Sequence, residues 1–252
     1  MQWYYALSGL LGGFLVGLTG VGGGSLMTPL LVMAFGVTPM TAVGTDLLYA
    51  ALTKAGGVWA HGRRHNIHWP VTGRLLLGSV PAALLTLWLV AQYPQLHPDQ
   101  TLIRRILACA LLLTALALSC GLHNRACGTS LRLSSWAPWA TPGLGALIGT
   151  LVSLTSVGAG AIGTSALLVL YPGMPLARIV GTDIAHAVPL TLIAGLDHWY
   201  LGHVNGLLLI NLLLGSLPGI WLGSRCHGLI PEKFTRLLLS LLLLGLALQL
   251  LR

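Results

Sequence analysis

Two acidic residues stand at equivalent places in long apolar segments. Asp46 and Asp183 are two of only five acidic residues in the sequence, and each follows the same Val-Gly-Thr triplet. A carboxylate at membrane depth costs roughly 3 kcal/mol to insert, so such residues usually line a pathway or relay protons. We therefore expect these two side chains to carry a coupling proton, or to bind sodium together with backbone carbonyl groups.

Other interpretations of these polar residues stay open. Asp46 follows closely on an expected helix start, where a carboxylate also serves as a cap. Lys54 has no equivalent, because Thr191 aligns with it. It is expected to attract substrate, to pair with Asp46, or to extend to the membrane surface. His186 lies three residues after Asp183 on the same helical face, either as part of a proton relay or as an interfacial residue.

Glycine clusters interrupt two apolar segments. Residues 12–25 place four glycines within five positions, and residues 149–160 repeat this stretch at an offset of 136. Glycine in a helix costs about 1 kcal/mol relative to alanine, so both helices should break. Paired interruptions of this kind point to binding sites in transporters, and freed N–H groups attract anions. The expected substrate-binding residues are Thr19, Gly20, Gly22, Gly23, Gly24, Ser25, Thr45, Thr155, Ser156, Gly158, Gly160 and Thr182.

Small residues also recur every four positions ahead of each break. Gly9 and Gly13 occupy one helical face, and Gly145 and Gly149 do the same in the second half. This pattern predicts close helix–helix packing. The glycines of the breaks have the same alternative explanation.

The chain is an internal duplication. The blocks 43–46 and 78–81 recur as 180–183 and 215–218, both at an offset of 137. Blocks that recur in one order indicate repeated units. We expect a first transmembrane repeat at 1–122, a cytoplasmic connector at 123–135 and a second transmembrane repeat at 136–252.

Composition sets the class of protein. The 252 residues are 55% hydrophobic and only 7% charged, where a soluble domain carries about 25% charged residues. We therefore expect an integral membrane protein. The net charge is +8, but the basic residues are scattered as singles and pairs and form no basic stripe, so no nucleic-acid partner is expected. The four cysteines lack zinc spacing and no ATPase motif is present, so we expect no metal, no cofactor and no enzymatic activity.

The expected fold is all-α, with each repeat formed by a broken-helix hairpin and three transmembrane helices. If each broken segment crosses the membrane once, the basic loop residues divide six against six; if each is a hairpin, they divide nine against three. The second division satisfies the positive-inside rule, which makes the repeats inverted and puts both termini outside the cytoplasm. The expected helices are 3–18, 26–35, 39–59, 70–90, 102–122, 136–154, 161–171, 176–196, 206–224 and 232–251.

The glycine motif resembles that of a known family. Gly-x-Gly-Gly-Gly-Ser at 20–25, followed by Pro29, the Gly44-Thr45 pair and the duplication, is similar to the sulfite exporter TauE/SafE family. The resemblance implies a secondary transporter in the bacterial inner membrane that moves a small sulfur-containing anion, such as sulfite or an organosulfonate. Asp46 and Asp183 depart from the neutral residue expected after Gly-Thr, which suggests a different coupling ion or substrate. The alternatives are an uncoupled anion channel and a membrane partner that hands a sulfur compound to a soluble enzyme.

Overall fold

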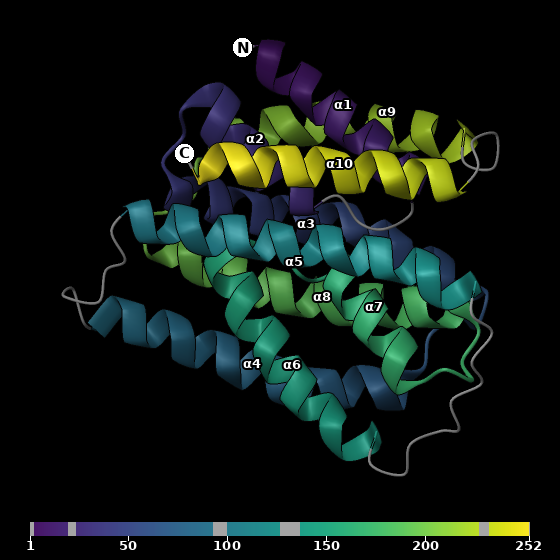
Figure 1. Cartoon of the computed structure of the whole chain (residues 1–252). Helices are drawn as coiled ribbons and strands as arrows, with labels where there is room; N and C mark the ends of the chain where they lie inside the picture. The colour runs from purple at the N-terminus through teal and green to yellow at the C-terminus, as the bar shows by residue number, and fades with distance from the viewer. Residues whose placement is uncertain (1–2, 20–23, 93–99, 127–136, 227–231, 252) are drawn as a thin grey trace.

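The described part of the chain is helical throughout. The computed structural model describes residues 3–19, 24–92, 100–126, 137–226 and 232–251, and no strand forms within these ranges (Figure 1). The helices are α1 (Trp3–Thr19), α2 (Gly24–Phe35), α3 (Pro39–Arg63), α4 (Trp69–Gln92), α5 (Gln100–Ala126), α6 (Ala137–Thr155), α7 (Ala161–Leu170), α8 (Leu176–Tyr200), α9 (Gly206–Cys226) and α10 (Glu232–Leu250).

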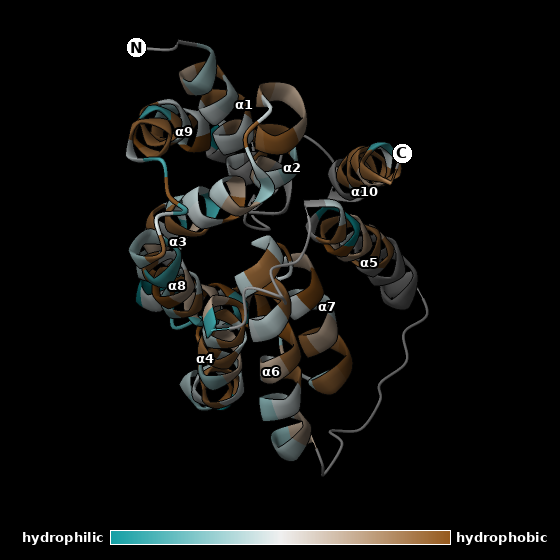
Figure 2. Cartoon of the chain, turned by 90° about the vertical axis from the view of Figure 1, so that its left-hand side faces the viewer, coloured by the Kyte–Doolittle hydropathy of each residue, from teal (hydrophilic) through white to brown (hydrophobic). Residues whose placement is uncertain are grey.

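Four helices are long and apolar enough to cross a membrane by length and composition: α4, α6, α8 and the part of α9 at Gly206–Gly223. Shorter apolar stretches lie at Tyr4–Leu15, Ala161–Leu170 and Leu237–Leu250. Hydrophobic colouring dominates α5, α9 and α10 in Figure 2. These helices support a membrane location. Three full spans in each half were expected, whereas four in total meet this criterion among the described residues.

The order of the helices was predicted, but several ends were not. α3 continues to Arg63 and α8 to Tyr200, where ends near residues 59 and 196 were expected. α5 continues to Ala126, into the expected connector. Apolar runs locate the part of a helix that lies in hydrocarbon, whereas backbone hydrogen bonding continues into polar residues beyond it. Gly24, expected within the first break, is instead the first residue of α2.

Helices from the two halves pack in pairs. α1 lies against α9, α4 against α6, α3 against α8, and α5 beside α10 (Figure 1). The close packing predicted from the glycine spacing is confirmed, because Gly9 and Gly13 lie against the backbone of Leu212 and Ser216 in α9. Gly145 and Gly149 make the equivalent contacts with the backbone of Leu75 and Ser79 in α4, so the two crossings match.

Two apolar clusters hold the middle of the bundle. One joins α3, α4, α6 and α8 and includes Leu47, Ile148 and Leu190, all fully buried. The other joins α5 and α10 and includes Val157 and Ala161, which flank the junction between α6 and α7. Helix packing from two sides therefore fixes the position of this junction.

Candidate functional site

The predicted break in the second half is confirmed. α6 ends at Thr155 and α7 begins at Ala161. Between them the backbone adopts positive φ values at Ser156 (58°), Gly158 (125°) and Gly160 (144°). Glycine tolerates these angles, whereas a positive φ at serine is uncommon and is characteristic of functional sites. Thr155 stabilises the turn, because its hydroxyl accepts a hydrogen bond from the Val157 N–H at 3.2 Å.

The break presents unpaired backbone donors at the start of α7. The N–H of Gly163 donates to Gly158 O at 3.2 Å, and that of Thr164 donates to Gly160 O at 2.8 Å. By contrast, no N–H of residues 158–162 donates to another residue that the structure describes. A helix N-terminus carries a partial positive charge, so this end of α7 favours an anion.

Each predicted acidic residue is held by a threonine of the neighbouring short helix. Thr28 on α2 donates to Asp46 Oδ2 at 2.5 Å, and Thr164 on α7 donates to Asp183 Oδ2 at 2.9 Å. Asp46 is 0% exposed and Asp183 is 1% exposed. In both residues Oδ1 has no hydrogen-bond partner in the described structure. The interpretation of Asp46 as a cap is wrong, because α3 begins seven residues earlier, at Pro39.

Lys54 is buried beside the break. Its ammonium donates to the Ala159 carbonyl at 2.7 Å, and only 6% of its surface is exposed. The interpretation in which Lys54 extends to the membrane surface is therefore wrong. Its positive charge acts on both Asp183 and Asp46, although it forms a close ion pair with neither within the described residues. Ser156, from the break itself, lies beside Asp46.

His186 also belongs to this centre. Its Nε2 shares a 2.8 Å hydrogen bond with the hydroxyl of Ser79 on α4, and both side chains are fully buried. The equivalent of His186 in the first half, at the offset of 137, is Tyr49 on α3, which is 1% exposed. The two halves therefore differ in chemistry at this position while keeping an equivalent place in the fold.

Thr45 and Thr182 use their hydroxyls to hold loops of the opposite half. The Thr45 hydroxyl accepts from the Asn205 N–H at 3.1 Å, and the Thr182 hydroxyl accepts from the His68 N–H at 2.9 Å. The Thr182 hydroxyl also donates to Arg178 O at 2.6 Å. The structure thus places both predicted substrate ligands at contacts that join the two halves of the chain.

The first predicted break lies outside the described residues at Gly20, Gly22 and Gly23. Thr19 ends α1, and Ser25 follows the first residue of α2. Sequence reasoning missed Thr28 and Thr164, which hold the two carboxylates. The signal was present, because these threonines align at the same offset of 136 as the glycine clusters.

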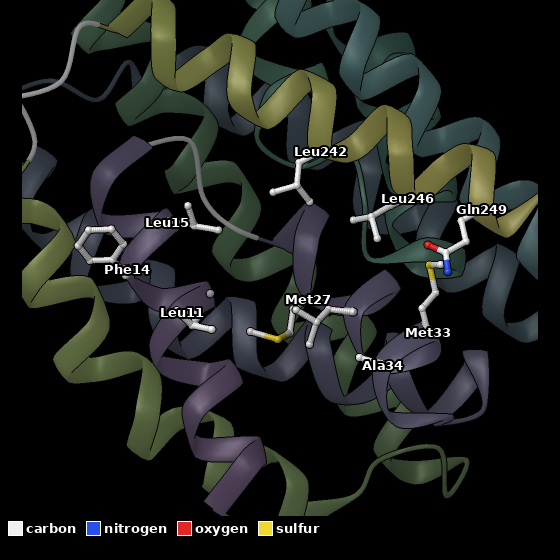
Figure 3. Close-up of a pocket in the computed structure, with 11 residues that line it drawn as sticks. Leu11, Phe14, Leu15, Met27, Met33, Ala34, Leu242, Leu246 and Gln249 are labelled. Carbon is white, nitrogen blue, oxygen red and sulfur yellow. The ribbon is translucent and has the colours of Figure 1, made fainter.

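An apolar cavity lies apart from this polar centre. It has a volume of about 530 Å³ and lies between α1, α2 and α10 (Figure 3). Leu11, Met27 and Leu242 line it, and Gln249 is its only strongly polar lining residue among those described. It lacks the charged groups that would recognise an anion, so we place the candidate site at the break and the two carboxylates.

A helical bundle with apolar candidate spans, an interrupted helix and buried charges at the interruption belongs to the class of membrane proteins. The profile of the Sulfite exporter TauE/SafE family matches residues 5–250, so the chain belongs to this family and is a membrane transporter rather than an enzyme.

Two relatives cover most of the chain. The Probable membrane transporter protein YjnA of Bacillus subtilis (strain 168) is 39% identical over 227 residues, which is 87% of each chain. The Probable membrane transporter protein YdhB of the same organism is 26% identical over 227 residues, covering 87% of this chain and 88% of the relative. No solved structure matches the chain.

Proposed function

We propose that the protein is a secondary transporter that moves a small sulfur-containing anion, such as sulfite or an organosulfonate, by alternating access. The observation that carries this proposal is the break between α6 and α7. Its free N–H groups lie at the start of α7, and Lys54 binds the Ala159 carbonyl of the same segment. Both features favour a negative charge.

Coupling to a proton or a sodium ion is assigned to the two carboxylates. Asp46 and Asp183 each keep one oxygen without a partner, although both residues are buried. Buried carboxylates of this kind line ion pathways and proton relays. His186 is included in the coupling group because it lies one helical turn from Asp183 and its imidazole is hydrogen-bonded to Ser79.

The two halves are proposed to be inverted repeats. Matched contacts support this arrangement: Thr28 with Asp46 and Thr164 with Asp183 within each half, and Thr45 and Thr182 across the halves. If all five helical segments of each half cross the membrane, the second repeat has the opposite orientation. The distribution of basic loop residues then favours both termini on the non-cytoplasmic side of the cell membrane. Inverted repeats that meet at broken helices suit alternating access.

The test uses the full chain reconstituted in liposomes on a solid-supported membrane. Sulfite, thiosulfate, sulfoacetate and taurine are applied with and without a pH step or a sodium gradient. We expect at least one of these solutes to give a current or counterflow that depends on the ion gradient. A flux that depends on neither gradient would indicate a channel. The proposal would be overturned if none of the four solutes gave counterflow.

A further inference from the structure

We propose that Lys54 is a built-in cation that replaces one of two coupling cations, so that the transport centre binds a single external monovalent cation beside Asp46. This inference rests on the proposed function, because it concerns the coupling site of the same transporter. It begins from the buried charges. Among the described residues, Asp46, Asp183 and Lys54 are the buried side chains of acidic or strongly basic type.

These charges do not balance. With both carboxylates ionised, the centre carries two negative charges and one positive charge. A buried charge without compensation is strongly unfavourable, so one further positive charge must accompany the second carboxylate. A duplicated site in which each half held only a carboxylate would require two such cations.

The Lys54 ammonium lies at a backbone carbonyl of an unwound segment, which is where a coupling cation binds in such transporters. It lies 2.7 Å from the carbonyl oxygen of Ala159, in the unwound segment between α6 and α7. In broken-helix transporters, carbonyl groups of unwound segments coordinate the coupling ion. The lysine thus contributes a cation from the chain itself at a carbonyl of the second break.

The charge of Lys54 lies on the side of Asp183. Its ammonium is held by Ala159 O in the segment that leads into α7, and Thr164 of α7 holds Asp183. Around Asp46, by contrast, the neighbouring polar groups are hydroxyls: Thr28 hydrogen-bonds to it and Ser156 lies beside it. Asp46 is therefore the carboxylate whose charge is left for an external cation.

Two buried oxygen atoms at this point have no hydrogen-bond partner in the described structure, Asp46 Oδ1 and Ser156 Oγ. Ser156 is 3% exposed and Asp46 is fully buried. Hard cations take oxygen ligands, and a proton binds the same carboxylate oxygen. We therefore assign the external cation, sodium or a proton, to Asp46 Oδ1 with the Thr28 and Ser156 oxygens nearby.

The second half offers a natural comparison for Lys54. Its equivalent on α8 is Thr191, whose hydroxyl donates to Ala187 O of its own helix at 2.8 Å. Lys54→Thr therefore gives both halves the same residue. Two other titratable groups interact with these charges: His186 on α8 with Lys54, and Tyr49 on α3 with Asp46.

The test counts bound cations by linkage in purified full-length protein. The unfolding equilibrium constant is measured in detergent against sodium concentration at fixed pH, and separately against pH at fixed sodium concentration. Each cation bound only by the folded state changes this constant by up to tenfold per tenfold change in cation concentration. The two arms distinguish sodium from the proton.

The expected counts follow from the charges. Wild type binds one cation, Lys54→Thr two, Asp46→Asn none, and the double variant Lys54→Thr/Asp46→Asn one. For a tenfold change in cation concentration, the unfolding equilibrium constant should therefore change by up to tenfold in wild type and up to a hundredfold in Lys54→Thr. It should not change in Asp46→Asn, and it should change by up to tenfold in the double variant. Lys54→Arg, which keeps the positive charge, should keep the wild-type count.

A wild-type response in Lys54→Thr or in Asp46→Asn would overturn the proposal, as would a changed count in Lys54→Arg. If Lys54→Thr does not fold, Lys54→Met/Asp183→Asn is measured instead, since it leaves Asp46 as the one buried charge of the three. That variant should bind one cation, and any other number refutes the assignment. These measurements require no transport, so they can succeed or fail independently of the flux assays in liposomes.

Discussion

Replacing Gly149 by alanine tests the packing that places the break. Gly149 on α6 lies against the backbone of Ser79 on α4, and an added Cβ would lie 2.7 Å from Ser79 Cα and 2.8 Å from its carbonyl carbon. It would also contact the carbonyl oxygen. These are backbone atoms that cannot rotate away, so α4 and α6 must separate. The Ser79 hydroxyl, which holds His186, would shift with α4.

The magnitude follows from two opposing terms. Overpacking a close contact costs about 1–3 kcal/mol, whereas alanine gains about 1 kcal/mol over glycine in a helix. Gly149→Ala should therefore lower the free energy of unfolding by up to about 2 kcal/mol. Gly143→Ala on the same helix is the matched control, because Gly143 is exposed and has no atom within 4 Å of an added Cβ. The difference between the two variants isolates the overpacking term.

Reversible unfolding in detergent, followed by circular dichroism, measures this difference. Gly13→Ala should match Gly149→Ala, because Gly13 makes the equivalent contact with Ser216 on α9. Equal stabilities for Gly149→Ala and Gly143→Ala would refute the described approach of α4 and α6. A large effect at Gly149 without one at Gly13 would show that the two crossings are not equivalent.

Three further changes test the site itself. Asp46→Asn and Asp183→Asn should abolish coupled transport in liposomes while leaving the protein folded, and wild-type uptake by both variants would contradict this. Gly23→Val should weaken substrate binding, and an unchanged affinity would reduce the role of that glycine to packing. Thr28→Val should alter the cation dependence of transport about 10-fold or more, because hydrogen bonds to charged groups are worth about 1.5–3 kcal/mol; Thr114→Val, which loses only a bond to Ala110 O of its own helix, should leave it unchanged.

The sequence predicted the break and the carboxylates for physical reasons. Glycines and a small polar residue at 156–160 disfavour a helix, and the structure interrupts the helix between Thr155 and Ala161. Asp46 and Asp183 were identifiable because an ionisable group within an apolar run must have a partner or a function. The repeat offset then placed the two carboxylates in equivalent environments, each with a threonine donor.

Contacts between distant segments were beyond that reasoning. Lys54 and Ala159 are 105 residues apart, and His186 and Ser79 are 107 apart. Hydropathy and motif spacing describe the neighbourhood of a residue along the chain, whereas these bonds depend on how α3 and α8 cross the other half. The same limit applies to Thr45 and Thr182, whose hydroxyls hold loops that begin well away from them in sequence.

Two buried differences between the halves lie on one pair of helices. α3 and α8 pack against each other, and they carry Lys54 opposite Thr191 and Tyr49 opposite His186 in the repeat alignment. Contacts that hold the bundle are instead duplicated, including the glycine crossings and the threonine–aspartate hydrogen bonds. In the proposed alternating-access mechanism, the duplicated frame would permit two equivalent openings, and the single lysine would give the polar centre the same charge balance in both. The residues that set ion coupling should therefore be sought along α3 and α8, and exchanging residues 49 and 54 with 186 and 191 should change coupling more than it changes stability.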